Sequence, residues 1–161
     1  MRPTVDELRG LFELREGGLF WRTDVANKSN NFAGKKAGCM DCYGYLTVGI
    51  NYRIYKVHRV IFAIANGRWP AGPVDHINLN KADNRPENLR ECTIYQNNCH
   101  RPANRNNTSG FKGVVRSQGK WHVKIRVCGK RINLGAYHDL ELAAFVYQCA
   151  AEKYHGAFAH S

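Results

Sequence analysis

Acidic residues are scarce in this sequence, and long apolar runs are absent from it. The chain of 161 residues has 13 Asp and Glu against 24 Lys and Arg, a formal net charge of +11. No apolar run approaches the roughly 20 residues that a membrane-spanning helix needs, and Met1-Arg2-Pro3 leads into polar residues rather than a signal peptide. We therefore expect a cytoplasmic protein without a membrane partner.

The shortage of acids is greatest between His100 and His138, where there is none. Such one-sided charge favours a polyanionic partner, although a solvated basic face is the simpler alternative. The nine basic residues of this segment are Arg101, Arg105, Lys112, Arg116, Lys120, Lys124, Arg126, Lys130 and Arg131.

The cysteines do not form a complete zinc motif. Cys39-x-x-Cys42 has the spacing of half a zinc site, and no second pair with that spacing follows. Cys92 and Cys99 could supply the other half in principle. We expect free, reduced cysteines and no structural zinc.

Hydrophobic residues make up 43% of the chain, enough to build the core of one domain or of two small ones. Period and turn signals predict a mixed α+β fold whose first part is a β-hairpin and helix region. The expected elements are a helix at Val5–Leu14, a strand at Leu19–Arg22, a loop at Thr23–Gly38, hairpin strands at Gly44–Ile50 and Arg53–His58, and a helix at Arg59–Asn66.

Polar residues with metal-binding and proton-accepting capacity cluster between residues 74 and 98. Asp75 offers a hard oxygen ligand for a divalent cation, and His76 beside it accepts a proton near neutral pH. Asn97 adds a second, neutral oxygen. Asn and Asp are also common loop formers, but so many at this spacing favour a functional site.

This segment resembles the HNH, or ββα-metal, endonuclease motif over residues 40 to 100. The resemblance rests on Val74-Asp75-His76-Ile77-Asn78, on Asn84-Arg85-Pro86-Glu87-Asn88-Leu89-Arg90 and on Thr93-x-x-x-Asn97. The preceding Tyr55, His58-Arg59-Val60-Ile61 and Asn66-Gly67-Arg68-Trp69-Pro70 are similar to phage and intron-encoded members. For a phage-encoded protein, the expected location is the host cytoplasm.

The resemblance implies one divalent metal, Mg²⁺ or Mn²⁺, held by Asp75 and Asn97, with His76 as the general base. Asn98 competes with Asn97, but the spacing from Thr93 favours Asn97. The resemblance makes Asn88 the residue that holds His76 in position. It also implies DNA contacts from His58, Arg59, Arg85 and Arg90. His58 could instead orient the hairpin, and the last two arginines could pair with Glu87 and Glu91.

The sequence changes character after a basic linker at residues 101–108. Three strands are expected at Phe111–Arg116, Lys120–Val127 and Lys130–Tyr137, with one apolar and one cationic face in the middle strand. A helix should begin after Asp139, end at Gly156 and cover the apolar face. The apolar residues of this helix are Ala143, Val146, Tyr147, Ala150, Ala151 and Tyr154.

This segment resembles an AP2 DNA-binding domain. The matching residues are Ser109-Gly110-Phe111-Lys112-Gly113-Val114, Gly119-Lys120-Trp121, Ile125-Arg126, Asn133-Leu134-Gly135-Ala136-Tyr137 and Ala143-Ala144-x-x-Tyr147. The family places a three-stranded sheet in the DNA major groove. By position, the DNA-facing residues implied are Arg116, Trp121, His122, Lys124, Arg126, Arg131 and Asn133. Trp121 could equally brace the sheet.

Together these features predict a nuclease domain at residues 1–100, a linker at 101–108 and an AP2-like domain at 109–161. The expected function is site-specific, metal-dependent cleavage of double-stranded DNA by a monomer, which would nick one strand, as in phage or mobile-element homing endonucleases. The principal alternative is a DNA-binding regulator with an inactive nuclease motif. An RNA-directed protein and a zinc-dependent adaptor are further alternatives.

Overall fold

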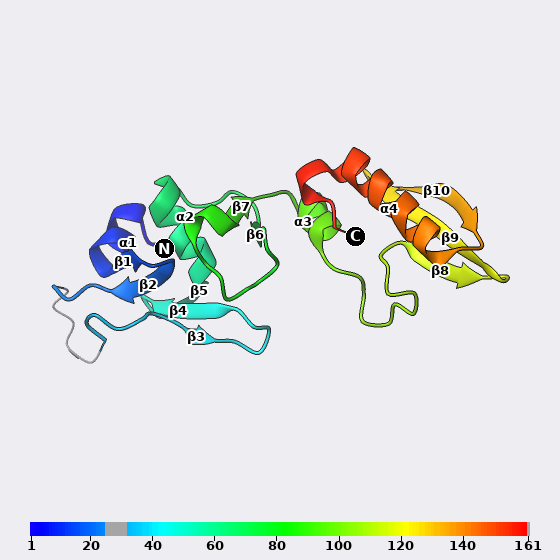
Figure 1. Cartoon of the computed structure of the whole chain (residues 1–161). Helices are drawn as coiled ribbons and strands as arrows, with labels where there is room; N and C mark the ends of the chain where they lie inside the picture. The colour runs from blue at the N-terminus through cyan, green and yellow to red at the C-terminus, as the bar shows by residue number, and fades with distance from the viewer. Residues whose placement is uncertain (25–31, 161) are drawn as a thin grey trace. The chain divides into compact units, whose positions relative to one another are not determined.

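The computed structural model describes residues 1–24 and 32–160, and the chain divides into two compact units, Met1–Cys92 and Thr93–Ser161 (Figure 1). Each unit combines helices with small antiparallel sheets, which confirms the predicted α+β class. The division falls before the predicted linker, because helix α3 (Ile94–His100) packs with η2 (Gly156–Phe158) in the second unit. That the nuclease domain extends to residue 100 stays a prediction.

The first unit contains, in sequence order, a helix, two hairpins, a second helix and a final two-stranded sheet. Residues 25–31 of the predicted Thr23–Gly38 loop lie outside the described residues. The elements in order are α1 (Val5–Leu11), β1 (Phe12–Arg15), β2 (Gly18–Trp21), β3 (Cys39–Met40), β4 (Leu46–Ile50), β5 (Arg53–Lys56), α2 (Val57–Asn66), β6 (Val74–His76), η1 (Pro86–Asn88) and β7 (Leu89–Glu91).

The N-terminal helix is shorter than predicted. It ends at Leu11, and the expectation that it continues to Leu14 was wrong, because Phe12 begins a strand that pairs with Trp21. The two rings pack with their centroids 4.4 Å apart. Glu16 and Gly17 turn the chain with positive φ angles of 45° and 72°. Phe12 and Leu14, which were predicted to be helical, therefore belong to a hairpin.

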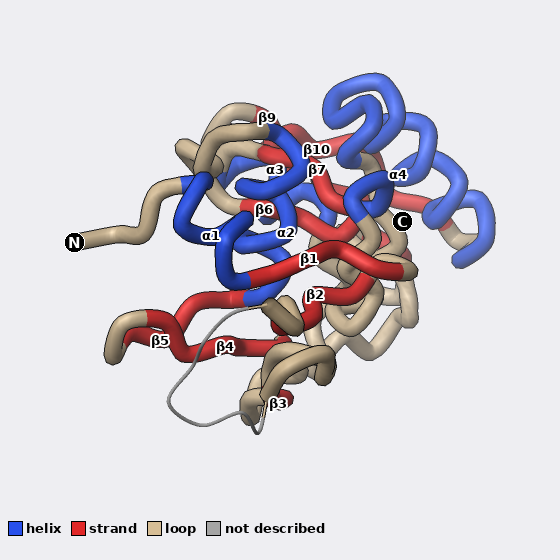
Figure 2. Tube along the Cα trace, turned by 90° about the vertical axis from the view of Figure 1, so that its left-hand side faces the viewer, coloured by secondary structure: helices blue, strands red, loops and turns tan. Residues whose placement is uncertain are grey.

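The predicted central hairpin is present as β4 and β5, joined by a tight turn (Figure 2). Asn51 and Tyr52 form that turn with φ angles of 49° and 60°. Helix α2 begins at Val57, earlier than the expected Arg59, so His58 lies in its first turn instead of at a strand end. The helix ends, as predicted, at Gly67, which adopts φ 67°.

The core of the first unit is formed by α1, α2 and the faces of the hairpins turned toward them. Its most buried side chains include Leu8, Phe12, Leu19, Val60 and Ile61. Trp69, after α2, donates from Nε1 to the carbonyl of Pro3 at 2.8 Å. This bond ties the chain that leads into β6 to the N-terminal segment.

The second unit is a three-stranded antiparallel sheet covered on one face by a helix, with α3 preceding it in sequence. Its core includes Val114, Val123, Ile125, Ala143 and Tyr147. The remaining elements are β8 (Val114–Ser117), β9 (Lys120–Val127), β10 (Lys130–Tyr137) and α4 (Leu140–His155).

Within the second unit, the predicted strand and helix bounds hold closely except at the start of the first strand, and one helix residue differs in its exposure. Asp139 caps α4 by accepting from the backbone N–H of Leu142 at 2.6 Å, and Gly156 follows its last residue. The first strand begins at Val114 rather than Phe111, because Gly113 takes φ 71° beside the Tyr147 ring. Tyr154, expected on the buried face, is 40% exposed.

Across residues 1–24 and 32–160, no helix combines the length and apolar character that crossing a membrane requires.

Candidate active site and sheet surface

Asp75 lies on β6, where it is paired across the ladder with Arg90 of β7. Nε and Nη2 of Arg90 each lie 2.9 Å from Oδ2 of Asp75, and the Asp75 residue is only 7% exposed. Arg90 was expected to contact phosphate or to pair with Glu87 or Glu91. Its partner is instead the predicted metal ligand, because residues directly opposite on a ladder share one face of the sheet.

His76 follows Asp75 and has different neighbours. Its Nε2 lies 2.9 Å from Oδ1 of Asn84, a side chain that is 3% exposed. The Asn84 amide nitrogen donates to the carbonyl of Ala82 at 3.4 Å, which leaves its oxygen to face the imidazole. An oxygen acceptor there puts the ring proton on Nε2 and leaves the lone pair on Nδ1. Asn84 was not predicted as a site residue from the sequence, since an Asn in a loop is typical of a turn.

A second imidazole packs beside His76. The rings of His58 and His76 meet edge to face with centroids 5.0 Å apart, and the Tyr45 ring lies 5.4 Å from His58 and 6.2 Å from His76. Burial, then the positive charges of His76, Arg59 and Lys56, lower the pKa of His58 to about 3, while Asp41 opposes the shift. A neutral, buried His58 favours the structural alternative over a phosphate contact.

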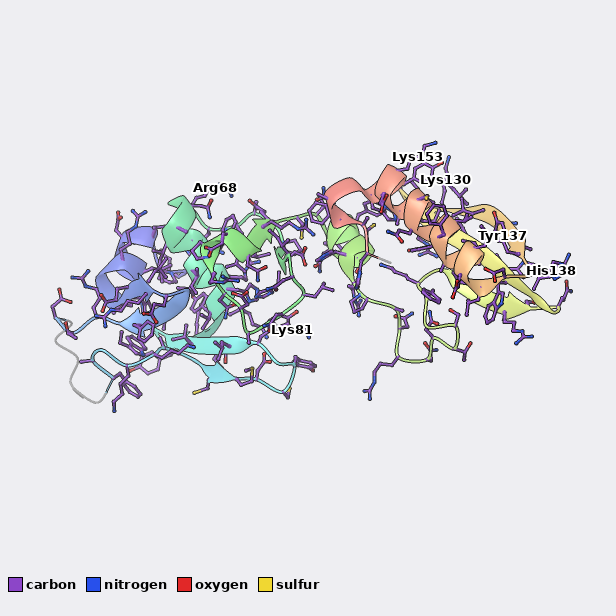
Figure 3. The ribbon with its side chains drawn as sticks, in the orientation of Figure 1. Arg68, Lys81, Lys130, Tyr137, His138 and Lys153 are labelled. Atoms are coloured by element: carbon purple, nitrogen blue, oxygen red, sulfur yellow. The ribbon has the colours of Figure 1, made fainter. Side chains whose placement is uncertain are left out.

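Two ammonium groups flank the Tyr45 ring. Nζ of Lys56 lies 4.6 Å from the ring centroid and Nζ of Lys81 lies 4.7 Å from it. Lys81 comes from the loop between β6 and β7 (Figure 3) and also donates to the carbonyl of Tyr43 at 3.0 Å. The loop after His76 is thereby tied to the turn before β4.

Asn88 bridges the loop between β6 and β7. Its Oδ1 accepts from the backbone N–H of Asn78 at 3.0 Å, and its Nδ2 donates to Oδ1 of Asn78 at 2.9 Å and to the carbonyl of Asp83 at 2.7 Å. These bonds close the loop that carries Asn84 to His76. They support the positioning role that the resemblance implies for Asn88.

Arg59 and Arg85, both expected to contact DNA, have internal partners. Arg59 donates to the carbonyls of Gly72 at 2.8 Å and Pro70 at 3.4 Å, which braces the approach to β6. Arg85 donates from Nε and Nη2 to the Asp83 carboxylate at 2.9 and 2.8 Å, and this guanidinium lowers the pKa of Asp83. Both arginines therefore have structural roles that weigh against free phosphate contacts.

Asn97, the second predicted metal ligand, lies on α3 in the second unit. The helix starts with a capping box, in which Thr93 Oγ1 accepts from the Gln96 N–H at 3.1 Å and Gln96 Oε1 accepts from the Thr93 N–H at 2.8 Å. This capping explains the Thr93-x-x-x-Asn97 spacing, because it begins the helix one residue after Thr93.

The donor set suits a hard divalent cation, since Asp75 and Asn97 both supply oxygen. Within the described part of the chain, no three His, Cys, Asp or Glu residues are grouped as a metal site. All six cysteines are free, with Cys39 and Cys42 exposed and Cys92 and Cys99 buried.

The strand register of the second unit divides the predicted DNA-facing residues between two faces of the sheet. Lys124 is paired with Asn133, Arg126 with Arg131, and His122 with Ala136. Because directly paired residues share a face, five predicted residues lie together on the face opposite the core residues Val123 and Ile125. These five are His122, Lys124, Arg126, Arg131 and Asn133.

Arg116 and Trp121 lie on the other face. They pair with each other in the β8–β9 register, the guanidinium lies 5.3 Å from the indole centroid, and Trp121 packs against the core. Their position opposite the five-residue face favours the alternative that Trp121 braces the sheet, and DNA contact by either residue stays a prediction. Val115, which the sequence analysis missed, is paired with His122 and is 59% exposed.

Comparisons with known proteins agree with the nuclease motif. Residues 55–99 match the family model described as HNH endonuclease, a range that starts in β5 and ends in α3. Protein 3.8 of Escherichia phage T7 is 32% identical over 111 residues, which cover 67% of this chain and 91% of that protein. No solved structure matches the chain.

Proposed function

The chain belongs to the same protein family as Protein 3.8 of the phage and contains an HNH endonuclease domain, and from this premise we propose that it is a site-specific, metal-dependent nicking endonuclease of the homing type. An HNH domain indicates a nuclease that hydrolyses DNA. The finer proposal adds a single divalent metal, a histidine base and a separate recognition surface.

Asp75 and Asn97 would hold one Mg²⁺ or Mn²⁺ ion through their side-chain oxygens. Such an ion supplies neutralisation of the charge that develops on the scissile phosphate and the leaving 3′ oxygen. Arg90 keeps the Asp75 carboxylate in a fixed orientation through the hydrogen bond from Nε to Oδ2 and the ion pair of Nη2 with the same oxygen. We therefore assign Arg90 to positioning Asp75 and not to a DNA phosphate.

His76 acts as general base by taking a proton from the attacking water on Nδ1. Asn84 accepts from Nε2 and so keeps the lone pair on the reactive nitrogen. Asn88 holds the loop that bears Asn84, which makes it a positioning residue. The hydrogen bond between His76 and Asn84 is the observation that carries this proposal, because it supports a proton-accepting Nδ1 on the residue next to Asp75.

The five-residue face of the sheet recognises double-stranded DNA. Arg126 and Arg131 can read guanine edges, Asn133 can read adenine, and Lys124 is suited to phosphate. Val115 and Ala136 add apolar contacts of the kind that thymine methyl groups accept. The AP2-like reading of this unit rests on that face and on the sequence motifs.

One active site in a monomer cuts one strand, so the expected product from supercoiled plasmid is the open circle. The test compares wild type with Asp75→Asn in Mg²⁺ or Mn²⁺, with and without chelator. Chelator-sensitive open circles from the wild type, and none from the variant, are expected. Equal nicking by both proteins would remove Asp75 as a ligand and favour contamination or another site.

A further inference from the structure

We propose that the C-terminal unit positions the metal ligand Asn97, with Tyr95, Lys112 and His155 as the positioning residues. This inference rests on the proposed function, because it takes Asn97 to be a ligand. Its basis is the set of contacts that hold α3 inside the second unit. The recognition unit then contributes to catalysis as well as to binding.

Lys112 caps the C-terminal end of α3. Its Nζ lies 2.5 Å from the carbonyl oxygen of Cys99 and 2.6 Å from that of Arg101. The last carbonyls of a helix have no partner within the helix, and a lysine ammonium is a suitable donor for them. Burial lowers the pKa of Lys112, which shows that this side chain is largely removed from solvent beside the two carbonyls.

Tyr95 holds the first turn of α3. Its hydroxyl lies 3.4 Å from the carbonyl oxygen of Arg126 on β9 and 3.3 Å from Nδ1 of His155, the last residue of α4. The two rings also meet edge to face, with centroids 5.9 Å apart. Burial, then the charge of Lys112, lower the pKa of His155. Because the Tyr95 hydroxyl donates its one hydrogen to the Arg126 carbonyl, its oxygen is left to accept from Nδ1–H of His155.

These polar contacts line a cavity beside α3 with a volume of about 600 Å³, and the apolar Ile94 at the start of α3 is 71% exposed. Helix α3 also packs with η2 through its buried C-terminal end. The polar anchors and this packing together set the position of α3. Side chains that line the cavity include Tyr95, Cys99, Lys112, Arg126, Tyr147 and His155.

Asn97 lies between the two anchored positions, two residues after Tyr95 and two before Cys99. Helix α3 has seven residues, or about two turns, so a shift or rotation of the helix moves Asn97 together with the anchored residues. Releasing either anchor should therefore displace the Asn97 amide oxygen. Partners that orient a metal ligand commonly change metal affinity by 10- to 100-fold when removed.

The test uses the full chain and three variants: Lys112→Met, Tyr95→Phe and the control Lys153→Met. Lys153 lies on α4 with its Nζ 5.6 Å from the Tyr154 centroid (Figure 3), so the control removes the same charge elsewhere in the unit. Tyr95→Phe keeps the ring and removes only the hydroxyl, which limits the risk of unfolding. The readouts are deuterium uptake over residues 94–100 and the Mn²⁺ concentration that gives half-maximal nicking.

We expect Lys112→Met and Tyr95→Phe to speed exchange in residues 94–100 by roughly tenfold and to raise the Mn²⁺ requirement by about as much, with the control unchanged. Exchange and Mn²⁺ requirement equal to those of the control would overturn the inference. Absence of nicking by the wild type would refute the proposed function instead, and the exchange rates would still decide whether this unit anchors α3.

Discussion

Arg90 lies directly across the β6–β7 ladder from Asp75. Its Nε donates to Oδ2 of the carboxylate at 2.9 Å, and its Nη2 forms an ion pair with the same oxygen at 2.9 Å. The side chains are 18% and 7% exposed, respectively. The predicted metal ligand is therefore a mostly buried carboxylate that has a cationic partner in the fold. Its orientation and its charge are both linked to Arg90.

Arg90→Met should destabilise the protein by about 3 kcal/mol, because removing one partner of a buried ion pair leaves the other charge in a costly environment. Mn²⁺ should then raise the melting temperature of this variant more than that of the wild type, since a cation bound to Asp75 would replace the lost charge. Thermal unfolding with and without Mn²⁺ measures both effects. An Arg90→Met protein that is as stable as the wild type would show that the pair contributes nothing.

Asn84→Ala should slow nicking by roughly tenfold to a hundredfold, a part of the roughly 10²–10⁴-fold that general-base catalysis contributes, and leave DNA affinity unchanged. The reason is that His76 loses the acceptor that fixes its tautomer. Single-turnover rates across pH measure the effect, because a shifted pH profile separates loss of orientation from loss of fold.

Asn80→Ala is the matched control for Asn84→Ala. Asn80 lies in the same loop, and its Oδ1 accepts only a local bond from the N–H of Ala82 at 3.0 Å. Its nicking rate should stay close to that of the wild type. Equal losses in the two variants would mean that the loop, and not the contact with His76, limits the reaction.

Arg126→Ala and Arg116→Ala distinguish the two faces of the C-terminal sheet. Arg126 shares its face with Lys124 and Arg131, whereas Arg116 packs over Trp121 on the other face. Arg126→Ala should cost about 1–3 kcal/mol of specific binding, and Arg116→Ala should cost much less. Gel-shift titrations at fixed salt measure the difference, and the reverse order would assign recognition to the opposite face.

The stability of the first unit should fall as the pH is lowered from 6.5 toward 3. Burial keeps the pKa of folded His58 at about 3, against 6.5 when the chain is unfolded, so the unfolded state alone binds this proton in between. Because the unfolded state binds more protons in this range, lowering the pH favours it. The free energy of unfolding therefore falls by up to about 1.4 kcal/mol per pH unit. His58→Phe should flatten the dependence in urea unfolding between pH 7 and 5, and an unchanged slope would exclude His58 as its source.

The sequence was a good guide to elements whose contacts are local. The β4–β5 hairpin, the three strands of the second unit and the capping of α4 by Asp139 follow from alternation, turn residues and a side chain three residues away. The helix predicted through Leu14 failed because pairing of Phe12 with Trp21 overrides the local pattern. The residues next to Phe12 in the sequence carry no information about its pairing with Trp21.

The candidate site was predictable in part. Asp75, His76 and Asn88 come from one short motif, but the anchors of α3 come from Lys112 and His155, which lie 13 and 60 residues from their partners. Arg116 and Trp121 were assigned to the DNA-facing surface by resemblance. Trp121 is separated by an even number of residues from Val123 and Ile125 on the same strand, so the alternation of side chains already indicated the core face. Asn84 carries no local signal that separates it from a turn residue.

The role of His76 as general base in metal-dependent nicking can be tested on one gel. Supercoiled plasmid is incubated with wild type or His76→Ala, with Mg²⁺ or Mn²⁺ and with or without chelator, and binding of both proteins to the same DNA is measured in parallel. We expect chelator-sensitive open circles from the wild type and an initial nicking rate at least about a hundredfold lower for His76→Ala. Both proteins should bind the DNA equally well. Equal nicking by the two proteins, or nicking that survives chelation, would contradict this role.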